Sequence, residues 1–408
     1  MNPTDLRRSA QQLLEQNILP YWWQQMRDPE GGFYGRRDGC NRLHADAERG
    51  AVMNARLLWA FSAAYRVLRK SEYLQAADWA KRYIQAHFLD PEFGGCYWSV
   101  MADGKPLDTK KQTYAQGFML YAFSEYARAT GDKQALQQAI QLYDVIERYA
   151  CQFAEISDNT AAVHPLGYVE ALTRDWQPTA DMRLSDKDEN AVFTMNTHLH
   201  LLEPYTNLYR VWHDEQLRWR LIDLLGIFIN RLYNPVTHHV DCYFDANWQS
   251  KRDIVSYGHD IEAAWLMNEA LRVLAEQSAV SNQSSTVTHQ QSVIQNIAVA
   301  SLEGLHTDGS LVHESADFSR QWWVECEAVI GYIDQWQITG DSVWLNRAEA
   351  VYRYSIEHLI DQTNGEWFWA ILPDGSVDRQ NDKAGFWKCP YHNTRMCIEL
   401  IERLQPLR

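Results

Sequence analysis

The sequence has no long hydrophobic run and no excess of positive charge, and each absence excludes a class of partner. Its longest apolar stretches, such as residues 221–229, are short and contain charges, so we expect no segment to span a bilayer. The 38 Lys and Arg residues are outnumbered by 53 Asp and Glu residues, which gives a net charge of −15. An acidic chain repels nucleic-acid phosphates and anionic lipid surfaces, so we expect neither nucleic acid nor a membrane as a partner.

The sequence is also poor in the features of exported and disulfide-bonded proteins. Its seven cysteines are widely spaced, odd in number and form no CxxC pair, which favours reduced thiols over a disulfide framework or a structural zinc site. Residues 1–8 are polar and charged, without the apolar core of a signal peptide. We therefore expect a cytoplasmic protein.

Aromatic residues, by contrast, are abundant. The chain contains 17 Trp and 21 Tyr among 408 residues. These side chains combine a flat apolar face with a polar group, which suits large cores and also stacking against sugar rings. Most of them are expected to pack the core, and those beside ionisable groups are candidates for a sugar site.

The periodicity of apolar residues indicates an all-α protein. Spacings of i, i+3, i+4 and i+7 predict helices over residues 51–67, 114–128, 134–149, 196–211, 217–232 and 260–276. Short strand-like pieces beside turn residues recur six times, at intervals of roughly 60 to 70 residues. Each interval has room for two helices and a turn.

This repetition predicts an (α/α)6 barrel, with twelve helices in two concentric rings and short β-hairpins at one mouth. An open solenoid would need polar capping repeats, and neither end of the chain shows one. No linker rich in Pro, Gly or Ser divides the chain, so residues 1–408 are predicted to form a single catalytic domain. The Ser/Gln/Thr-rich stretch 278–291 is predicted to be an exposed loop.

Two sequence segments place histidines near the start of a predicted helix. In the first, Asn196 and His200 are four residues apart and share a helix face, whereas His198 points elsewhere. In the second, His259 and Glu262 are three residues apart, so the carboxylate can hold the imidazole. Structural roles, a buried histidine and a helix-capping cluster, are the alternatives.

Two later segments add a third histidine and a pair of tryptophans. Pro390 precedes the last helix and places His392 in a loop at its start, where the helix N-terminus lowers the imidazole pKa and favours the neutral base. Trp322 and Trp323 are adjacent and would point in different directions. Histidines 200, 259 and 392 come from three repeats and could converge on one cavity.

Two other chemistries remain open from the residues alone. His198 with His200, and His259 with Glu262, could supply ligands to zinc, although neither spacing is specific. A glycosidase would need two carboxylates across a cleft, and the available ones are Asp188, Glu203, Glu262 and Glu325.

Several longer motifs resemble the N-acylglucosamine 2-epimerase superfamily, and within it the cellobiose 2-epimerase branch. They are NTHLHLLEPYTNLYR (196–210), SYGHDIEAAW (256–265), the pair Trp322–Trp323 and FWKCPYHNTRMC (386–397). Shorter matches are residues 54–56, 108–110, 114–116 and 185–188. The resemblance extends from about residue 15 to residue 405, and it implies the same (α/α)6 barrel.

The resemblance implies inversion at C2 of a reducing-end sugar, without metal or other cofactor, through an enediolate. It implies that His259 and His392 are the acid/base pair and that His200, with Asn196, handles ring opening. The implied substrate-binding residues are Arg56, Tyr114, Glu262, Asp188, Trp322, Trp323 and Trp387. The implied substrate is a β-1,4 disaccharide such as cellobiose, converted to glucosyl-mannose.

Related activities occur on the same barrel. N-acylglucosamine 2-epimerase, mannose epimerase and aldose–ketose isomerase are therefore the alternatives. The small-molecule sugar is the expected partner, and the oligomeric state is left open between a monomer and a homodimer.

Overall fold

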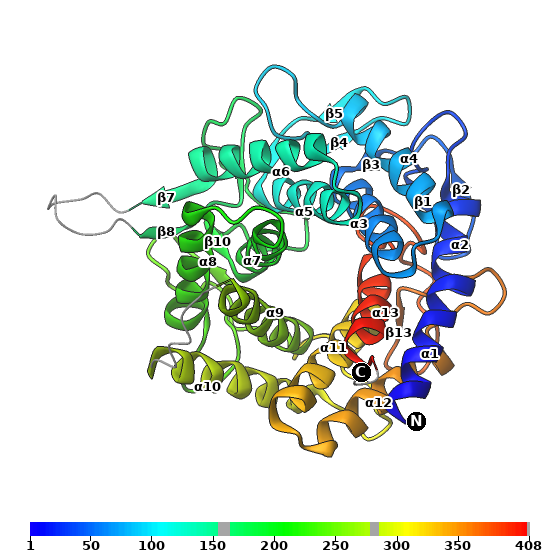
Figure 1. The fold of residues 1–408 in the computed structure, drawn as a ribbon, viewed down its shortest axis with the longest axis vertical. Helices are drawn as coiled ribbons and strands as arrows, with labels where there is room; N and C mark the ends of the chain where they lie inside the picture. The colour runs from blue at the N-terminus through cyan, green and yellow to red at the C-terminus, as the bar shows by residue number, and fades with distance from the viewer. Residues whose placement is uncertain (154–163, 278–284, 406–408) are drawn as a thin grey trace, which may run out of the picture.

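The helices form two concentric rings in a computed structural model that describes residues 1–153, 164–277 and 285–405 (Figure 1). The inner ring consists of α3 (Ala51–Leu68), α5 (Thr113–Thr130), α7 (Met195–Tyr209), α9 (Tyr257–Glu276), α11 (Trp322–Thr339) and α13 (Tyr391–Arg403). The outer ring contains α4 (Ser71–His87), α6 (Lys133–Val145), α8 (Glu215–Ile227), α10 (Ser285–Ala300) and α12 (Ser342–His358). Its remaining member is N-terminal: α1 (Pro3–Leu13) and α2 (Leu19–Tyr21), extended by the π-helical turns Leu14–Ile18 and Trp22–Met26. The predicted all-α barrel is confirmed.

The inner ring is closed by its last helix. Each inner helix packs against the next, and α13 returns to pack against α3 and α1. An inner helix is therefore covered on all sides, and α5 is buried along almost its whole length. Outer helices bury one face only: in α4 that face carries Tyr73, Ala76, Ala77, Ala80 and Ile84, the spacing of an amphipathic helix.

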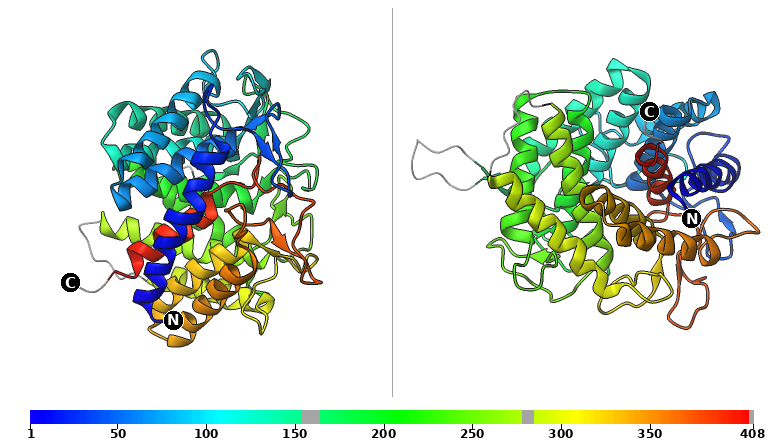
Figure 2. Two further views of the ribbon diagram at one scale, coloured as in Figure 1. Left: turned by 90° about the vertical axis from the view of Figure 1, so that its right-hand side faces the viewer. Right: turned by 60° about the horizontal axis from the view of Figure 1, so that its bottom comes forward.

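Short antiparallel strands and loops gather on one side of the ring (Figure 2, left). The paired sets are β1 (Arg36–Arg37) with β2 (Leu43–His44), β3 (Arg49–Gly50) with β4 (Ser99–Val100) and β5 (Pro106–Asp108), β6 (Lys111–Gln112) with β9 (Ala171–Leu172), β7 (Cys151–Phe153) with β8 (Pro165–Tyr168), β10 (Phe193–Thr194) with β11 (Tyr243–Phe244), and β12 (Arg320–Gln321) with β13 (Ala370–Ile371). Strands β3, β6, β10 and β12 each lead directly into an inner helix. The N-termini of the inner helices therefore open at this mouth, as the sequence predicts.

Buried ion pairs fix the turns of this mouth in a repeated way. An aspartate in a turn accepts the backbone N–H of the residue two positions ahead. It also binds a cation 21 or 22 residues further along the chain. The pairs are Asp28–Arg49, Asp90–Lys111 and Asp361–Lys383. Because both partners are buried and hydrogen-bonded, each pair holds its turn in a defined position.

The predicted loop at 278–291 is wrong over its second half. Residues 285–291 form the first turns of α10, and residues 278–284 lie outside the described part of the chain. The stretch contains neither Gly nor Pro, so its low apolar content does not prevent a helix once Val293, Ile294 and Ile297 pack inward.

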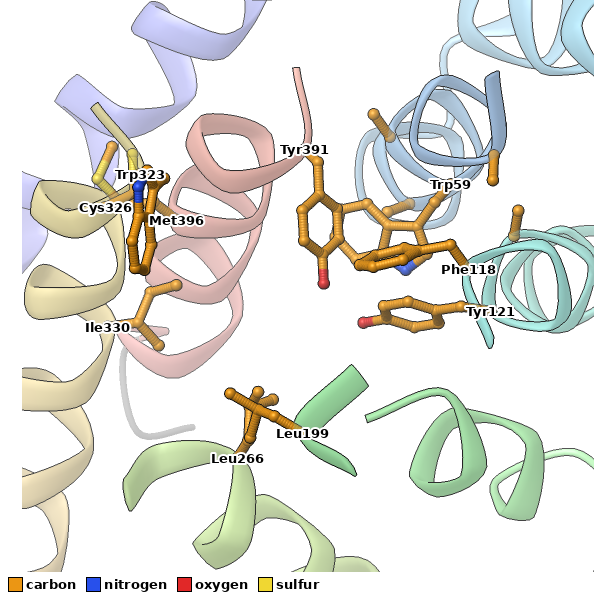
Figure 3. Packing of buried hydrophobic residues seen from close by; sticks show 14 of the residues in the cluster. Trp59, Phe118, Tyr121, Leu199, Leu266, Trp323, Cys326, Ile330, Tyr391 and Met396 are labelled. Atoms are coloured by element: carbon orange, nitrogen blue, oxygen red, sulfur yellow. The ribbon is translucent and has the colours of Figure 1, made fainter. Parts of the chain in front are cut away.

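Aromatic side chains fill the centre of the barrel between the helices. Trp59 of α3, Tyr121 of α5 and Tyr391 of α13 surround Phe118 (Figure 3). The ring centroids of Trp59 and Tyr391 lie 5.1 Å apart, edge to face. Among the described helices, none combines the length and apolar character needed to cross a membrane.

Candidate active site

A cavity of about 870 Å³ opens at the strand-bearing mouth. Its walls include every residue that the sequence predicts for the site: Arg56, Tyr114, Asp188, Asn196, His200, His259, Glu262, Trp322, Trp323, Trp387 and His392. These residues come from all six inner helices and from two loops at the mouth. The fold thus brings the predicted set together, and the role of each residue stays a prediction.

The three histidines are anchored in the same way, each through Nδ1. His200 Nδ1 lies 3.2 Å from Glu203 Oε2, and His392 Nδ1 lies 2.7 Å from Glu327 Oε1. His259 Nδ1 instead lies 2.8 Å from the hydroxyl of Ser256. In each ring Nε2 is left as the nitrogen that can act on a ligand. Glu262 does not hold His259 as expected, because Glu262 Oε1 binds Arg395 and Oε2 has no hydrogen-bond partner among the described residues.

Both histidines of the predicted acid/base pair are neutral at neutral pH. Burial, together with nearby His313 and His200, lowers the pKa of His259 to about 3. Burial, Arg56 and Arg395 lower the pKa of His392 well below its usual range. The direction agrees with the prediction for His392, but the main cause is burial, and His392 lies within α13 and not in a loop before it.

A buried ionic centre forms the floor of the cavity. The Arg395 guanidinium contacts three carboxylates, Glu203, Glu262 and Glu327. One cation cannot neutralise three anions, and burial raises the pKa of Glu262 and of Glu327 to about 7. Burial alone would also raise the pKa of Glu203, but Arg395 and His200 lower it to about 2. Glu262 and Glu327 can therefore gain or lose a proton near neutral pH.

One oxygen in this floor has no partner. Glu262 Oε2 is buried without a hydrogen bond among the described residues, and Glu262 lines the cavity. A buried polar atom without a partner is unfavourable unless a ligand satisfies it. This oxygen is thus a polar position available to a ligand.

Arg56 and Tyr114 form a pair of hydrogen-bond donors in the cavity wall. Arg56 Nη2 donates to the Tyr114 hydroxyl over 2.8 Å. Its guanidinium lies 4.2 Å from the Phe118 ring centroid and 4.7 Å from that of Tyr391, and Arg56 Nε has no partner among the described residues. The pair can stabilise a negatively charged oxygen in the cavity without reorganising.

Aromatic rings form the cavity walls. The Trp323 ring centroid lies 4.7 Å from that of His259 and 5.7 Å from that of His392, so this indole is next to both histidines. Trp322 points the other way, toward Trp369 at 4.6 Å. The two adjacent tryptophans thus diverge, as the sequence predicts.

The outer part of the cavity is more open. Trp387 is half-buried, and its ring centroid lies 5.8 Å from that of Trp98. Asp188 is also half-buried and accepts hydrogen bonds from Ser185 and from the Tyr243 hydroxyl, the latter over 3.1 Å. Asn196 Oδ1 has no partner among the described residues. These groups could contact a second sugar or its hydroxyls.

The geometry does not support the zinc pairs considered from the sequence. His198 uses both nitrogens structurally: Nδ1 lies 2.6 Å from the Thr194 carbonyl, and Nε2 accepts the Tyr168 N–H over 3.0 Å. In the part of the chain that the structure describes, only Glu262, Glu327 and His392 bring ligand atoms close enough for a metal ion. Arg395 already contacts both of those carboxylates, so a guanidinium holds the place that a cation would take.

Four residues that hold this site together were not predicted as site residues from the sequence. Three of them lie three residues from an assigned histidine: Ser256 before His259, Glu203 after His200, and Arg395 after His392. That spacing is a usable signal, because residues three apart share a helix face. Glu327 lies on α11, which carries no histidine, so no local pattern points to it.

Comparison with known proteins matches the whole barrel. The profile of the family N-acylglucosamine 2-epimerase (GlcNAc 2-epimerase) matches residues 32–395. The cellobiose 2-epimerase of Bacteroides fragilis is 48% identical over 97% of this chain and 98% of its own. The structure of cellobiose 2-epimerase from Bacillus thermoamylovorans superposes with a TM-score of 0.89 at 38% identity, over 98% of this chain and 100% of that chain. A more distant relative, the D-mannose isomerase of Marinomonas mediterranea, is 22% identical over 92% of each chain.

Proposed function

Because the chain belongs to the N-acylglucosamine 2-epimerase family, we propose that it inverts C2 of the reducing-end glucose of β-1,4 disaccharides, converting cellobiose to glucosyl-mannose. One observation carries this proposal: His259 and His392, from separate inner helices, lie next to Trp323 in one cavity, and both are neutral. The identity to the cellobiose 2-epimerase of Bacteroides fragilis supports the choice of substrate.

The first step is opening of the sugar ring. A C2 proton becomes acidic only beside an aldehyde, so the cyclic hemiacetal must open before the proton can leave. His200, held through Nδ1 by Glu203, is positioned to move a proton between the ring oxygen and the C1 hydroxyl, with Asn196 beside it in α7. Histidine suits this exchange because a neutral imidazole donates a proton from one ring nitrogen and accepts one at the other.

The second step removes the C2 proton and leaves an enediolate. The electron pair of the C2–H bond forms the C1–C2 double bond, and the negative charge moves to the C1 oxygen. Arg56 and Tyr114 supply donors for that oxygen, and preorganised donors of this kind are a large source of catalysis. Glu262, whose Oε2 has no partner among the described residues, would bind a substrate hydroxyl.

The third step returns a proton to the other face of C2. Inversion needs two groups on opposite sides of the planar intermediate, and His259 and His392, which line one cavity from separate inner helices, would supply them. One ring takes the proton and the other gives one, and the roles exchange in the reverse reaction. A hydrolase with two carboxylates would not require the two histidines.

A sugar beyond the reducing end would lie in the outer cavity. The volume of about 870 Å³ exceeds the requirement of a single hexose ring. Trp387, Trp322 and the half-buried Asp188 border this outer part. Stacking on an indole and hydrogen bonds from a carboxylate to hydroxyls would retain the second ring.

The experiment follows C2 in deuterated water. The protein is incubated separately with cellobiose, lactose, mannose, glucose and N-acetylglucosamine, and NMR records both the product and the label. We expect the β-1,4 disaccharides to yield products with mannose at the reducing end and deuterium at C2. Release of unlabelled monosaccharide would indicate a hydrolase, and no change with any sugar would contradict the proposal.

The same experiment separates the alternative activity. The 22% identical D-mannose isomerase motivates it, since an enediolate that is reprotonated at C1 gives a ketose. Conversion of mannose or N-acetylglucosamine alone would keep the enediolate chemistry and exclude the disaccharide substrate.

We further propose that residues 1–408 act as one catalytic domain in the cytoplasm, as a monomer or homodimer, without a metal. All seven cysteines are free thiols, which supports a reducing compartment. The packing of α13 against both α3 and α1 supports the single domain.

A further inference from the structure

Glu327 of α11 contacts both the Arg395 guanidinium of the ionic floor and the His392 imidazole. Its carboxylate is fully buried, and its Oε1 lies 2.7 Å from His392 Nδ1. The same oxygen lies 2.7 Å from Arg395 Nη2, and Oε2 accepts the indole N–H of Trp265 over 3.0 Å. Glu327 thus joins α11 to α13 and α9 at one point below the cavity.

The partners of Glu327 fix what it can do for the imidazole. An indole N–H and a guanidinium only donate hydrogen bonds, and the ionised carboxylate of Glu327 presents an acceptor to them on both oxygens. The acceptor that faces His392 is the oxygen already bound to Arg395. An imidazole nitrogen beside such an acceptor carries a hydrogen, which leaves the lone pair on Nε2.

His259 has a different partner and hence a different freedom. The Ser256 hydroxyl at 2.8 Å can donate to Nδ1 or accept from it by rotating its hydrogen. His259 can therefore change tautomer within its site, whereas a carboxylate held by two fixed donors cannot reverse its polarity. His259 and His392 therefore differ in how firmly their Nδ1 partners fix the tautomer.

We infer that Glu327 is a positioning residue for His392, which holds the ring as the Nδ1–H tautomer so that Nε2 faces the sugar as a base. This inference rests on the proposed function. In the reaction, Nε2 takes the C2 proton, the C–H electron pair enters the enediolate, and the ring becomes an imidazolium. Glu327 then accepts the Nδ1–H of that cation, a charge-assisted hydrogen bond that strengthens as the proton moves. The return of the proton from Nε2 restores the neutral ring.

The test begins with the tautomer in the full-length wild-type protein. Histidine nitrogens are labelled with ¹⁵N, and the signals of His392 are identified by their loss in His392→Gln. At a pH above about 7, the value to which burial raises the pKa of Glu327, we expect hydrogen on Nδ1 and a bare Nε2. Hydrogen on Nε2 of the wild-type protein would overturn the inference without any variant at Glu327.

Glu327→Gln is the informative substitution. Its amide group can donate to Nδ1, which favours the opposite tautomer. We expect His392 to lose the pure Nδ1–H state and kcat on cellobiose to fall by roughly 10²–10⁴, with KM changed by much less. Unchanged kcat, or a variant that keeps the Nδ1–H tautomer and still loses activity, would contradict a positioning role.

Two further variants separate positioning from packing. Glu325→Gln changes another fully buried carboxyl group of α11, which accepts the Leu311 N–H over 3.1 Å and does not bond to His392. This variant should leave the His392 tautomer and kcat unchanged. Trp265→Phe removes the donor to Oε2 and keeps an aromatic ring beside Arg395, so the Nδ1–H tautomer should persist with a smaller loss of kcat than in Glu327→Gln. If Glu325→Gln impaired kcat as strongly as Glu327→Gln, loss of packing would explain both.

The inference about Glu327 and the proposed function can fail separately. If no sugar exchanges its C2 proton in the wild-type protein, the proposed reaction fails, while the tautomer of His392 still reports whether Glu327 holds the ring.

Discussion

Pro204 follows His200 by four residues in α7, so the carbonyl of His200 has no helical N–H to accept. The backbone of His200 departs from helical geometry, with φ −87° and ψ 17°. A proline inside a helix removes one hydrogen bond and kinks the helix at that point. The kink sets the direction from which His200 enters the cavity.

Gly117 of α5 packs against this kink, and its replacement by Ala should disturb His200. An added Cβ would lie 2.5 Å from the His200 carbonyl oxygen, which is a backbone atom and can only move with the helix. We expect Gly117→Ala to lower the free energy of unfolding by about 1–3 kcal/mol and to reduce kcat. Thermal unfolding and disaccharide kinetics check both effects.

Gly226→Ala is the matched control in a helix. An added Cβ there meets no atom closer than 3.9 Å, and Ala favours a helix over Gly by about 1 kcal/mol. Stability should stay the same or rise, and kcat should not change. Equal effects of the two substitutions would show that the contact with His200 is unimportant.

His259→Ala and His392→Ala should each abolish turnover while the fold stays intact. Each substitution removes a group that carries the C2 proton, a contribution worth roughly 10²–10⁴ in rate. Epimerisation of cellobiose, with circular dichroism for the fold, is the measurement. Near-normal activity of either variant would show that the two-histidine assignment is wrong; His358→Ala, on an exposed position of α12, serves as control.

Glu170→Gln should make the protein more stable than wild type above about pH 5, and increasingly so up to about pH 8. Burial raises the pKa of Glu170 from 4.5 to about 8, so the unfolded chain ionises first and wild-type stability falls as pH rises through this range. Gln does not ionise, and it can accept from the Thr194 N–H and donate to the Thr197 hydroxyl, where Glu170 now bonds. Each unit of pKa difference corresponds to about 1.4 kcal/mol.

Urea unfolding at several pH values tests whether Glu170 lowers the stability of the wild-type protein as pH rises. The difference in free energy of unfolding between Glu170→Gln and wild type should grow from about pH 5 to about pH 8. A difference that does not depend on pH would show that Glu170 keeps an ordinary pKa in the folded protein.

Trp387→Ala should weaken turnover of disaccharides more than that of monosaccharides. Stacking of the second sugar on this half-buried indole should contribute about 1–2 kcal/mol, which corresponds to roughly a 5- to 30-fold loss in kcat/KM. Trp219→Ala, on an exposed residue of α8, should have no effect. An equal loss for both classes of sugar would place the second ring elsewhere.

Activity should persist after exhaustive chelation. Arg56, Tyr114 and the histidines supply the charge stabilisation and proton transfer that a metal would otherwise provide. The test measures turnover and metal content before and after dialysis against a chelator. Stoichiometric metal whose removal and return abolish and restore activity would contradict the metal-free mechanism.

Much of the site was predictable because its signals are local. The motifs around His200, His259 and His392 place each ring near the start of a helix, and all three line the cavity. Long-range partners were not predictable in this way. His259 was expected to contact Glu262, but a Ser256 hydroxyl on the preceding turn is closer to its Nδ1, and Glu262 instead binds Arg395 across the barrel.

The sequence by itself determined the helices, their sixfold repetition and the types of residue at the mouth, because apolar periodicity and turn chemistry act between near neighbours along the chain. The predicted loop at 285–291 shows the limit of that reasoning, since packing against the inner ring stabilises a helix where composition favours a loop. Only the tertiary structure decided that Glu327 supports His392 and that one Arg395 serves three carboxylates. The three carboxylates lie on α7, α9 and α11, whereas Arg395 and His392 lie on α13. Closure of the ring brings them within hydrogen-bond distance at buried positions, where a charge needs a partner from another helix.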